Sequence, residues 1–214
     1  MTYLQLVNSV LVRLRESQVT SVSDNSYSLL IGQLVNDAKR AVEDAFDWDA
    51  LGTTVNGTTT SGTSNYTITG SGIRHKGVVI NNYTSKNQLI NVPIQWIIDQ
   101  QQLATVTNSL PMYYAWNGTD GTDSKIEVFP TPDGTYTLKI NLYVSQATLS
   151  DDADVLLVPS EPVILGAYAR ALVERGEDQG LNSSEAYALF RSSLSDHIAL
   201  ESSRFIENSV WVPT

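Results

Sequence analysis

The sequence contains no cysteine and only two histidines, and these absences exclude several chemistries. Without cysteine there is no disulfide, no thiolate nucleophile and no cysteine-bound zinc site. His75 and His197 are too few for a multi-histidine metal centre. Basic residues are also scarce: the chain has 13 of them and 23 acidic residues, which gives a formal net charge of −10. Phosphate recognition needs a basic surface, so we expect no sequence-specific nucleic-acid partner.

Long apolar runs are missing as well. No window approaches the ~18 apolar residues that a membrane-spanning helix requires, so we expect no membrane partner. Residues 1–16 mix apolar and polar residues and lack the basic start and apolar run of a secretory peptide. We therefore expect synthesis in a cytoplasm. The 42% apolar content is typical of a globular chain, and 214 residues suffice for one large domain or two small ones.

Both ends of the chain show the apolar spacing of amphipathic helices. The predicted helices cover residues 3–16, 27–45, 160–176 and a last segment that starts near Asn182 or Ser183. We predict that Ser160 caps the third helix and that Gly176 and Gly180 end it. In the second helix the predicted buried face consists of Leu30, Leu34, Ala38, Ala41 and Ala45.

The middle of the chain has a different composition, rich in Thr, Ser, Gly and Asn. These residues disfavour a helix over 52–72, where we predict one strand at 66–69. Further strands are predicted at 78–80 and 89–92, and a short helix at 93–103. Residues 125–129 and 136–144 alternate between apolar and polar side chains, and a Pro-Thr-Pro-Asp-Gly turn joins them. We predict that these two strands form a β-hairpin.

Together these elements predict an α+β fold, a four-helix bundle built from both chain ends with an inserted antiparallel β-domain. The bundle would comprise residues 1–50 and 156–203, and the β-rich domain residues 51–155. Residues 204–214 would form a C-terminal tail.

Residues with catalytic chemistry form no recognisable site. Ser195, Asp196 and His197 are the residue types of a catalytic triad, but consecutive residues of a helix point in different directions. Acidic residues gather at 43–49 and 151–154 without the spacing of a calcium loop, so we interpret them as solvated acids. A glycosidase would need two carboxylates, such as Glu127 with Asp99 or Asp133, and nothing selects these. We expect no enzyme activity, no cofactor and no metal.

Three segments resemble the head-to-tail adaptor family of short-tailed bacteriophages, also called portal adaptors or tubular proteins. They are LLIGQLVNDAKRAVEDAFDWDALGTT at 29–54, KIEVFPTPDGTYTLKINLYVSQATLSDDAD at 125–154 and LLVPSEPVILGAYARALVERGED at 156–178. The resemblance implies a virion structural protein, made in the host cytoplasm, that forms a homo-oligomeric connector ring of twelve copies. Such a ring joins the portal protein to a tail or nozzle protein and guides DNA passage.

The tail beyond residue 204 is apolar for a chain terminus. We interpret four of its residues as a partner-binding site for a neighbouring subunit or the portal: Phe205, Val210, Trp211 and Val212. Folding back onto the protein's own helices remains an open alternative for this segment.

A carbohydrate-binding or adhesin-like β-module is the alternative function. It would need exposed aromatic rings from residues 113–116. A hydrolase with an unrecognised carboxylate pair is the third possibility.

Overall fold

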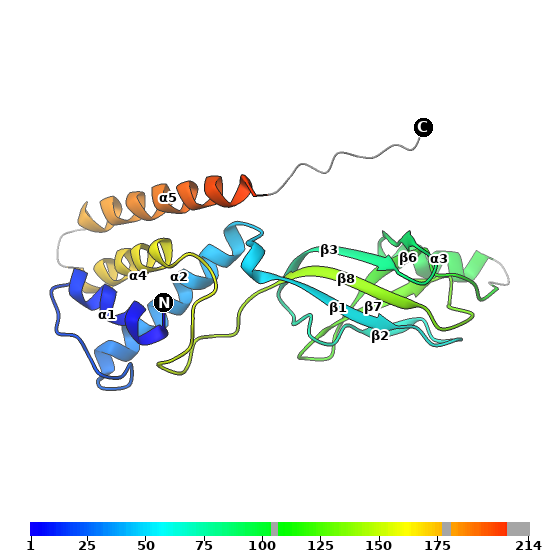
Figure 1. Ribbon diagram of the computed structural model, residues 1–214, viewed down its shortest axis with the longest axis horizontal. Coiled ribbons are helices and arrows are strands. Elements are labelled where there is room, and N and C mark those ends of the chain that lie inside the picture. Colours follow the sequence, from blue (N-terminus) through cyan, green and yellow to red (C-terminus); the bar gives the residue numbers. More distant parts are fainter. Residues whose placement is uncertain (104–106, 177–180, 205–214) are drawn as a thin grey trace. The chain divides into compact units, whose positions relative to one another are not determined.

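The computed structural model describes residues 1–103, 107–176 and 181–204, and it is of mixed α+β type (Figure 1). The chain divides into two compact units. The helical unit comprises Met1–Ala50 and the residues from Gln146 onward, and the β-unit comprises Leu51–Ser145. No helix among the described residues is long and apolar enough to span a membrane.

Four helices make up the described part of the helical unit. They are α1 (Tyr3–Arg13), α2 (Ser26–Ala45), α4 (Ser160–Arg175) and α5 (Leu181–Ser202). Helix α4 contacts each of the other three, and α1 also contacts α2. This central position explains why α4 is buried on almost every side, from Val163 to Ala171. Gly166 on α4 permits close approach, since an added Cβ would lie 3.1 Å from the Phe190 ring of α5 and 3.2 Å from Ala38 Cβ of α2.

The buried face of α2 is only partly the predicted one: Ala38 is fully buried as predicted, but its predicted neighbours are not. Leu30 and Leu34 are only half-buried and Ala45 is exposed, whereas Ile31, Val35 and Val42 are fully buried. Polar residues share the true face, since it also contains Ser28, Asn36, Lys39 and Glu43. Two apolar stripes lie side by side on α2, and the prediction chose the one with Leu30 and Leu34 over the one that is buried.

The ends of the helices follow local capping chemistry. Thr2 and Asn25 accept hydrogen bonds from the backbone N–H groups of Gln5 and Ser28, and they begin α1 and α2. Gly176 ends α4 in the left-handed conformation, with φ of 64°, as the sequence indicated. Ser160 is the first helical residue and not the predicted cap, because Pro159 occupies that position. Gly180 lies outside the described residues.

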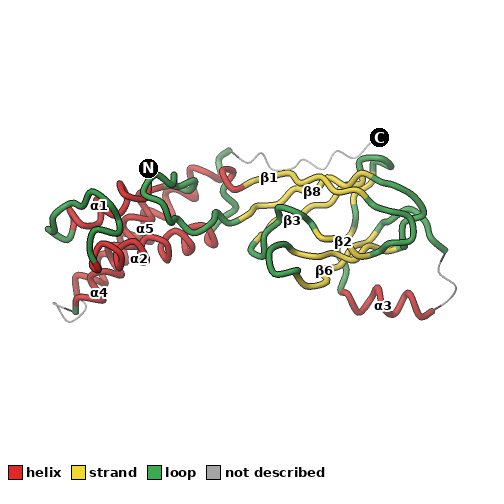
Figure 2. The backbone as a smooth tube through the Cα atoms, turned by 90° about the horizontal axis from the view of Figure 1, so that it is seen from below, coloured by secondary structure: helices red, strands yellow, loops and turns green. Residues whose placement is uncertain are grey.

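The β-unit is a sandwich of two four-stranded sheets (Figure 2). The first sheet has the order β1-β8-β3-β4, with strands Gly52–Thr58, Thr137–Val144, His75–Asn82 and Asn87–Gln88. The second has the order β2-β7-β6-β5, with strands Asn65–Thr67, Ser124–Phe129, Tyr113–Thr119 and Ile90–Asn91. Pairing is antiparallel except between β5 and β6, which run parallel.

Inward side chains of both sheets form one core. Ile80, Leu138 and Ile140 come from the first sheet, and they pack with Ile126 and Val128 from the second. Helix α3 (Ile94–Leu103) matches the helix expected at 93–103 and contacts β6. Its Trp96 ring lies 4.8 Å from the Tyr113 ring and 5.8 Å from the Phe129 ring.

The predicted hairpin between residues 125–129 and 136–144 is wrong, although both strands exist. Strand β7 belongs to the second sheet and β8 to the first, so the Pro130–Tyr136 connection crosses from one sheet to the other. Both strands bury their alternate side chains in the shared core, which explains the pattern. The alternation of apolar and polar residues therefore predicted the buried face of each strand, but it did not predict which strand is its hydrogen-bonded neighbour. Strand β1, within the segment 52–72, was not predicted at all.

Candidate partner-binding site

The predicted tail residues Phe205, Val210, Trp211 and Val212 lie outside the described residues. The structure does show where the tail begins. Arg204 Nη1 lies 3.1 Å from Glu201 Oε2 near the end of α5. The backbone N–H of Asp49 donates to Glu201 Oε1 at 3.1 Å, so this end of α5 is fixed beside the segment that follows α2.

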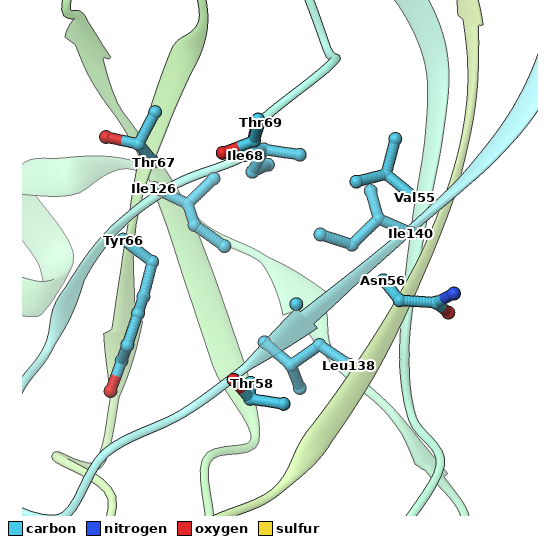
Figure 3. Close-up of a pocket in the computed structure, with 11 residues that line it drawn as sticks. Val55, Asn56, Thr58, Tyr66, Thr67, Ile68, Thr69, Ile126, Leu138 and Ile140 are labelled. Atoms are coloured by element: carbon cyan, nitrogen blue, oxygen red, sulfur yellow. The ribbon is translucent and has the colours of Figure 1, made fainter.

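A groove opens in the β-unit between the edge strands of its two sheets (Figure 3). We call it the edge groove; its volume is about 280 Å³. Val55 of β1 lines it with Leu138 and Ile140 of β8, while Ile126 of β7 and Ile68 lie opposite. These side chains point into the space between the sheets (Figure 3). The edge groove thus gives access to the apolar core of the sandwich.

The edge groove exists because β1 has a glycine at a core-facing position. Val55 is paired with Ile140 and Gly57 with Leu138, so both face the core. A Cβ built on Gly57 would meet no atom within 4 Å. The rim is neutral and polar, with Asn56, Thr58 and Thr67, and no charged residue lines the groove. The site suits an apolar side chain of an uncharged partner.

A second exposed apolar surface lies in the helical unit. Leu189 and Leu200 are 60% and 67% exposed, and they are eleven residues apart on α5, which places them on one side of that helix. Val173 near the end of α4 is 67% exposed. Large apolar groups on the surface of a helical unit are typical of protein contact sites.

The triad-type residues are not assembled into a catalytic site. His197 Nδ1 lies 2.8 Å from the carbonyl oxygen of Ser193, and Nε2 lies 3.9 Å from Glu161 Oε2. Ser195 and Asp196 are exposed on other sides of α5. No group of three potential metal ligands occurs within residues 1–103, 107–176 and 181–204.

In the acidic cluster at 43–49, Asp44 and Asp49 are exposed as interpreted, but Glu43 is not a solvated acid. Glu43 is only 2% exposed, and its Oε1 accepts a hydrogen bond from Lys39 Nζ at 3.0 Å. The charge of Glu43 is thus compensated from within the same helix.

At 151–154 the carboxylates hold backbone groups. Asp152 accepts from the N–H of Val22, and Asp154 accepts from the N–H groups of Ser150 and Asp151. The latter two bonds lower the pKa of Asp154 below its usual value.

The other candidate residues are also engaged in structural contacts. Glu127 accepts hydrogen bonds from Gln101 and Asn117, and Asp99 accepts one from Gln95. Tyr136 donates to Asp133. Glu127, Asp99 and Asp133 each bind a different partner, so these contacts do not bring them together as a catalytic pair.

The aromatic segment 113–116 does not form an exposed platform. Tyr114 is 3% exposed, Trp116 packs against the core, and Tyr113 lies under Trp96. The arrangement that a carbohydrate-binding module needs is therefore not present in these rings.

Sequence reasoning missed the edge groove. One signal for it was present, a lone glycine two residues after Val55 in a threonine-rich stretch. In a strand, that spacing places the glycine beside Val55 on the same face and leaves a gap there. The strand itself had to be recognised first, and its single large apolar residue was too weak a pattern.

Comparison with known proteins gives one family. The model of a family described as SU10 adaptor protein matches residues 1–209 of the chain. No curated protein matches the sequence.

Proposed function

We propose, since the chain belongs to the SU10 adaptor protein family, that it is a structural protein of the virion and forms the head-to-tail adaptor ring of a bacteriophage. In this proposal twelve copies join the portal protein to a tail or nozzle protein, and DNA passes through the ring. The family match over residues 1–209 is the observation that carries the proposal. The formal charge of −10 is in keeping with a channel that does not retain DNA.

The two units have separate roles in this proposal. The helices from both chain ends form one four-helix bundle, residues 1–50 and 156–203, which makes the body of the ring. Contacts of α4 with α1, α2 and α5 support this arrangement. Exposed Leu189 and Leu200 on α5 offer apolar area for contact between copies. The β-domain, residues 51–155, carries the contact with the tail protein.

The tail, residues 204–214, binds a partner in this proposal through Phe205, Val210, Trp211 and Val212. An aromatic residue flanked by valines resembles the anchors that dominate protein interfaces. The tail would join each copy to a neighbouring copy or to the portal.

Electron microscopy of the purified full-length chain mixed with the portal protein of the same phage tests the proposed function. We expect images with an added ring of density on one end of the portal, and no such ring on portal alone. Bovine serum albumin at equal concentration is the control for nonspecific crowding. Portal particles that are identical with and without the chain, at concentrations far above the expected affinity, would contradict the proposal.

A further inference from the structure

One sheet edge of the β-unit is suited to accept another strand. Each sheet has two edges, and three of these four edges are short: β2 has 3 residues, β4 has 2 and β5 has 2. Strand β1 has 7 residues, and its sequence, GTTVNGT, contains neither charge nor proline. It pairs regularly with β8 over its whole length. Folded proteins usually blunt such edges with charges, prolines or bulges.

The outer edge of β1 presents backbone groups in a known order. The N–H of Thr59 donates to the carbonyl of Tyr136 on the β8 side, while the carbonyl of Thr137 accepts from the N–H of Tyr83 on the β3 side. Because antiparallel pairs alternate along a ladder, the N–H groups of residues 54, 56 and 58 point away from β8. Strand β1 has no second neighbour within the described residues. An added strand would therefore find donors at every second residue.

The edge groove lies directly beside this row of backbone groups. A strand added to β1 would turn every second side chain inward, over Gly57 and toward Leu138 and Ile126. An apolar protein cavity of about 150 Å³ admits benzene, so about 280 Å³ has room for an indole ring. Backbone pairing combined with a pocket for alternate side chains is a known mode of peptide recognition.

We propose that the edge groove accepts residues 205–214 of a second copy of this chain, added as a strand to β1 with Trp211 over Gly57. Ten residues follow Arg204, and when extended they span about 33 Å against about 23 Å for β1. Valines flank Trp211, so their side chains and the indole would fall on opposite faces of the strand. This inference rests on the proposed function, because it names the acceptor of the tail within the ring.

Charge favours this occupant. Each copy carries a formal charge of −10, so two copies repel at long range, and an uncharged contact adds nothing to that repulsion. The lining of the edge groove has no charged residue, and Glu207 is the only charged side chain among residues 205–214.

Cross-linking between copies tests the inference, because the natural chain has no cysteine. Full-length Thr58→Cys and Ser209→Cys proteins are mixed under assembly conditions and treated with a short bismaleimide. We expect a cross-linked dimer that contains one chain of each variant. The matched control mixes Ser209→Cys with Asp37→Cys, an exposed position on α2, and should give no such dimer.

A groove-filling variant separates binding from folding. Gly57→Val adds side-chain atoms where an added Cβ meets nothing, so the protein should melt at the same or a higher temperature. It should lower the yield of the mixed dimer at least tenfold, and so should Trp211→Ala. Gln33→Ala, at an exposed position on α2 away from the groove, should leave the yield unchanged.

Several outcomes would overturn the inference. One is a mixed dimer that forms equally well with Gly57→Val. Another is a cross-link found only inside single chains of a Thr58→Cys/Ser209→Cys protein. A third is a Thr58→Cys thiol that is protected from maleimide only when portal is added, since the portal and not a second copy would then occupy the groove. If mixed dimers fail to form but portal images still show the added ring, the proposed function stands and strand addition is wrong. If mixed dimers form but no ring appears on the portal, strand addition stands and the proposed function is wrong.

Discussion

Lys39 and Glu43 lie one turn apart on α2, and both side chains are almost fully buried. Lys39 Nζ donates to Glu43 Oε1 at 3.0 Å and to the carbonyl oxygens of Gln146 and Ala147 at 2.7 and 3.1 Å. Asn36, one turn earlier, donates to the carbonyl of Leu149 and accepts from its N–H. These polar side chains fix the segment that leads toward α4 against the face of α2.

Removal of Lys39 alone should strongly destabilise the protein. Lys39→Met leaves a buried carboxylate without its ammonium partner and two carbonyls without their donor, so we expect a loss of about 3–5 kcal/mol in the free energy of unfolding. Lys39→Met combined with Glu43→Leu should recover most of that loss, because no charge then remains buried. Urea unfolding measures both. A double variant as unstable as the single one would mean that the backbone contacts of Lys39, and not the ion pair, dominate.

His75 gives the β-unit a pH-dependent stability. Its ring packs edge-on against Trp116, with centroids 4.6 Å apart, and its Nδ1 is buried without a hydrogen-bond partner among the described residues. Burial lowers the pKa of His75 below its ordinary value of 6.5. As the pH falls through 6.5, the unfolded chain therefore binds the proton first.

Stability should thus fall as the pH is lowered through 6.5, and then level off once the folded protein also takes up the proton. His75→Phe keeps a ring beside Trp116 and should flatten this slope, as measured by urea midpoints at several pH values. Carboxylates such as Asp154 have pKa values lowered from 3.8, so they act at lower pH. An unchanged slope in His75→Phe would show that another group is responsible.

At the scale of elements, close packing of α2 depends on Gly32. An added Cβ there would lie 2.9 Å from Val22 Cγ1, 3.1 Å from Tyr3 Cζ and in conflict with the Tyr3 hydroxyl. Asn36 donates to that hydroxyl, so the ring is not free to move. Gly32 thus sets how closely α1 and the loop before α2 approach the helix.

Gly32→Ala should destabilise the protein by about 1–3 kcal/mol, because overpacking outweighs the better helix propensity of alanine. Gln33→Ala, at the next and exposed position, should change stability by less than about 0.5 kcal/mol. Thermal melting of the two proteins compares them directly. A Gly32→Ala protein more stable than wild type would mean that α1 can shift without loss.

Most helices and strands were predictable from the sequence, but the elements against which they pack or pair were not. The apolar spacing of residues 3–16 identified α1, whose buried residues include Val7 and Leu11. On α2 the same spacing identified the buried Ala38 but gave a face rotated away from the true one, which also contains the buried Lys39 and Glu43. Strand alternation placed β7 and β8 without revealing that they lie in different sheets. Pairing depends on the whole fold, whereas periodicity is local.

The one sequence signal for the groove could not be interpreted without the fold, for the same reason. Gly57 is an ordinary loop residue in sequence, and it becomes an opening only when β1 is placed on β8 with Leu138 beside it. The tail, in contrast, was noticeable from sequence, since an apolar terminus with Trp211 needs no fold to be recognised. An apolar segment can be recognised from composition alone, whereas a groove that could accept it can be recognised only once the strands are placed.

At the scale of the whole molecule, charge governs how copies meet. Each chain has 23 acidic and 13 basic residues, so copies that approach one another repel at long range. The distance over which exposed charges interact falls from about 30 Å at 0.01 M salt to about 10 Å at 0.1 M. Salt should therefore remove a barrier to assembly, while the apolar contacts proposed for α5 and the edge groove are unaffected by screening.

We therefore expect self-association to tighten as salt is raised from about 0.01 M to about 0.1 M, with sedimentation velocity as the measurement. Asp196→Asn removes one exposed charge from α5 and should make the salt dependence shallower without altering the thermal midpoint. Association that weakens with salt would instead mean that attractive ion pairs hold the copies together. Some of the basic residues would then lie at the contacts, and apolar docking of the tail would not be the main source of affinity.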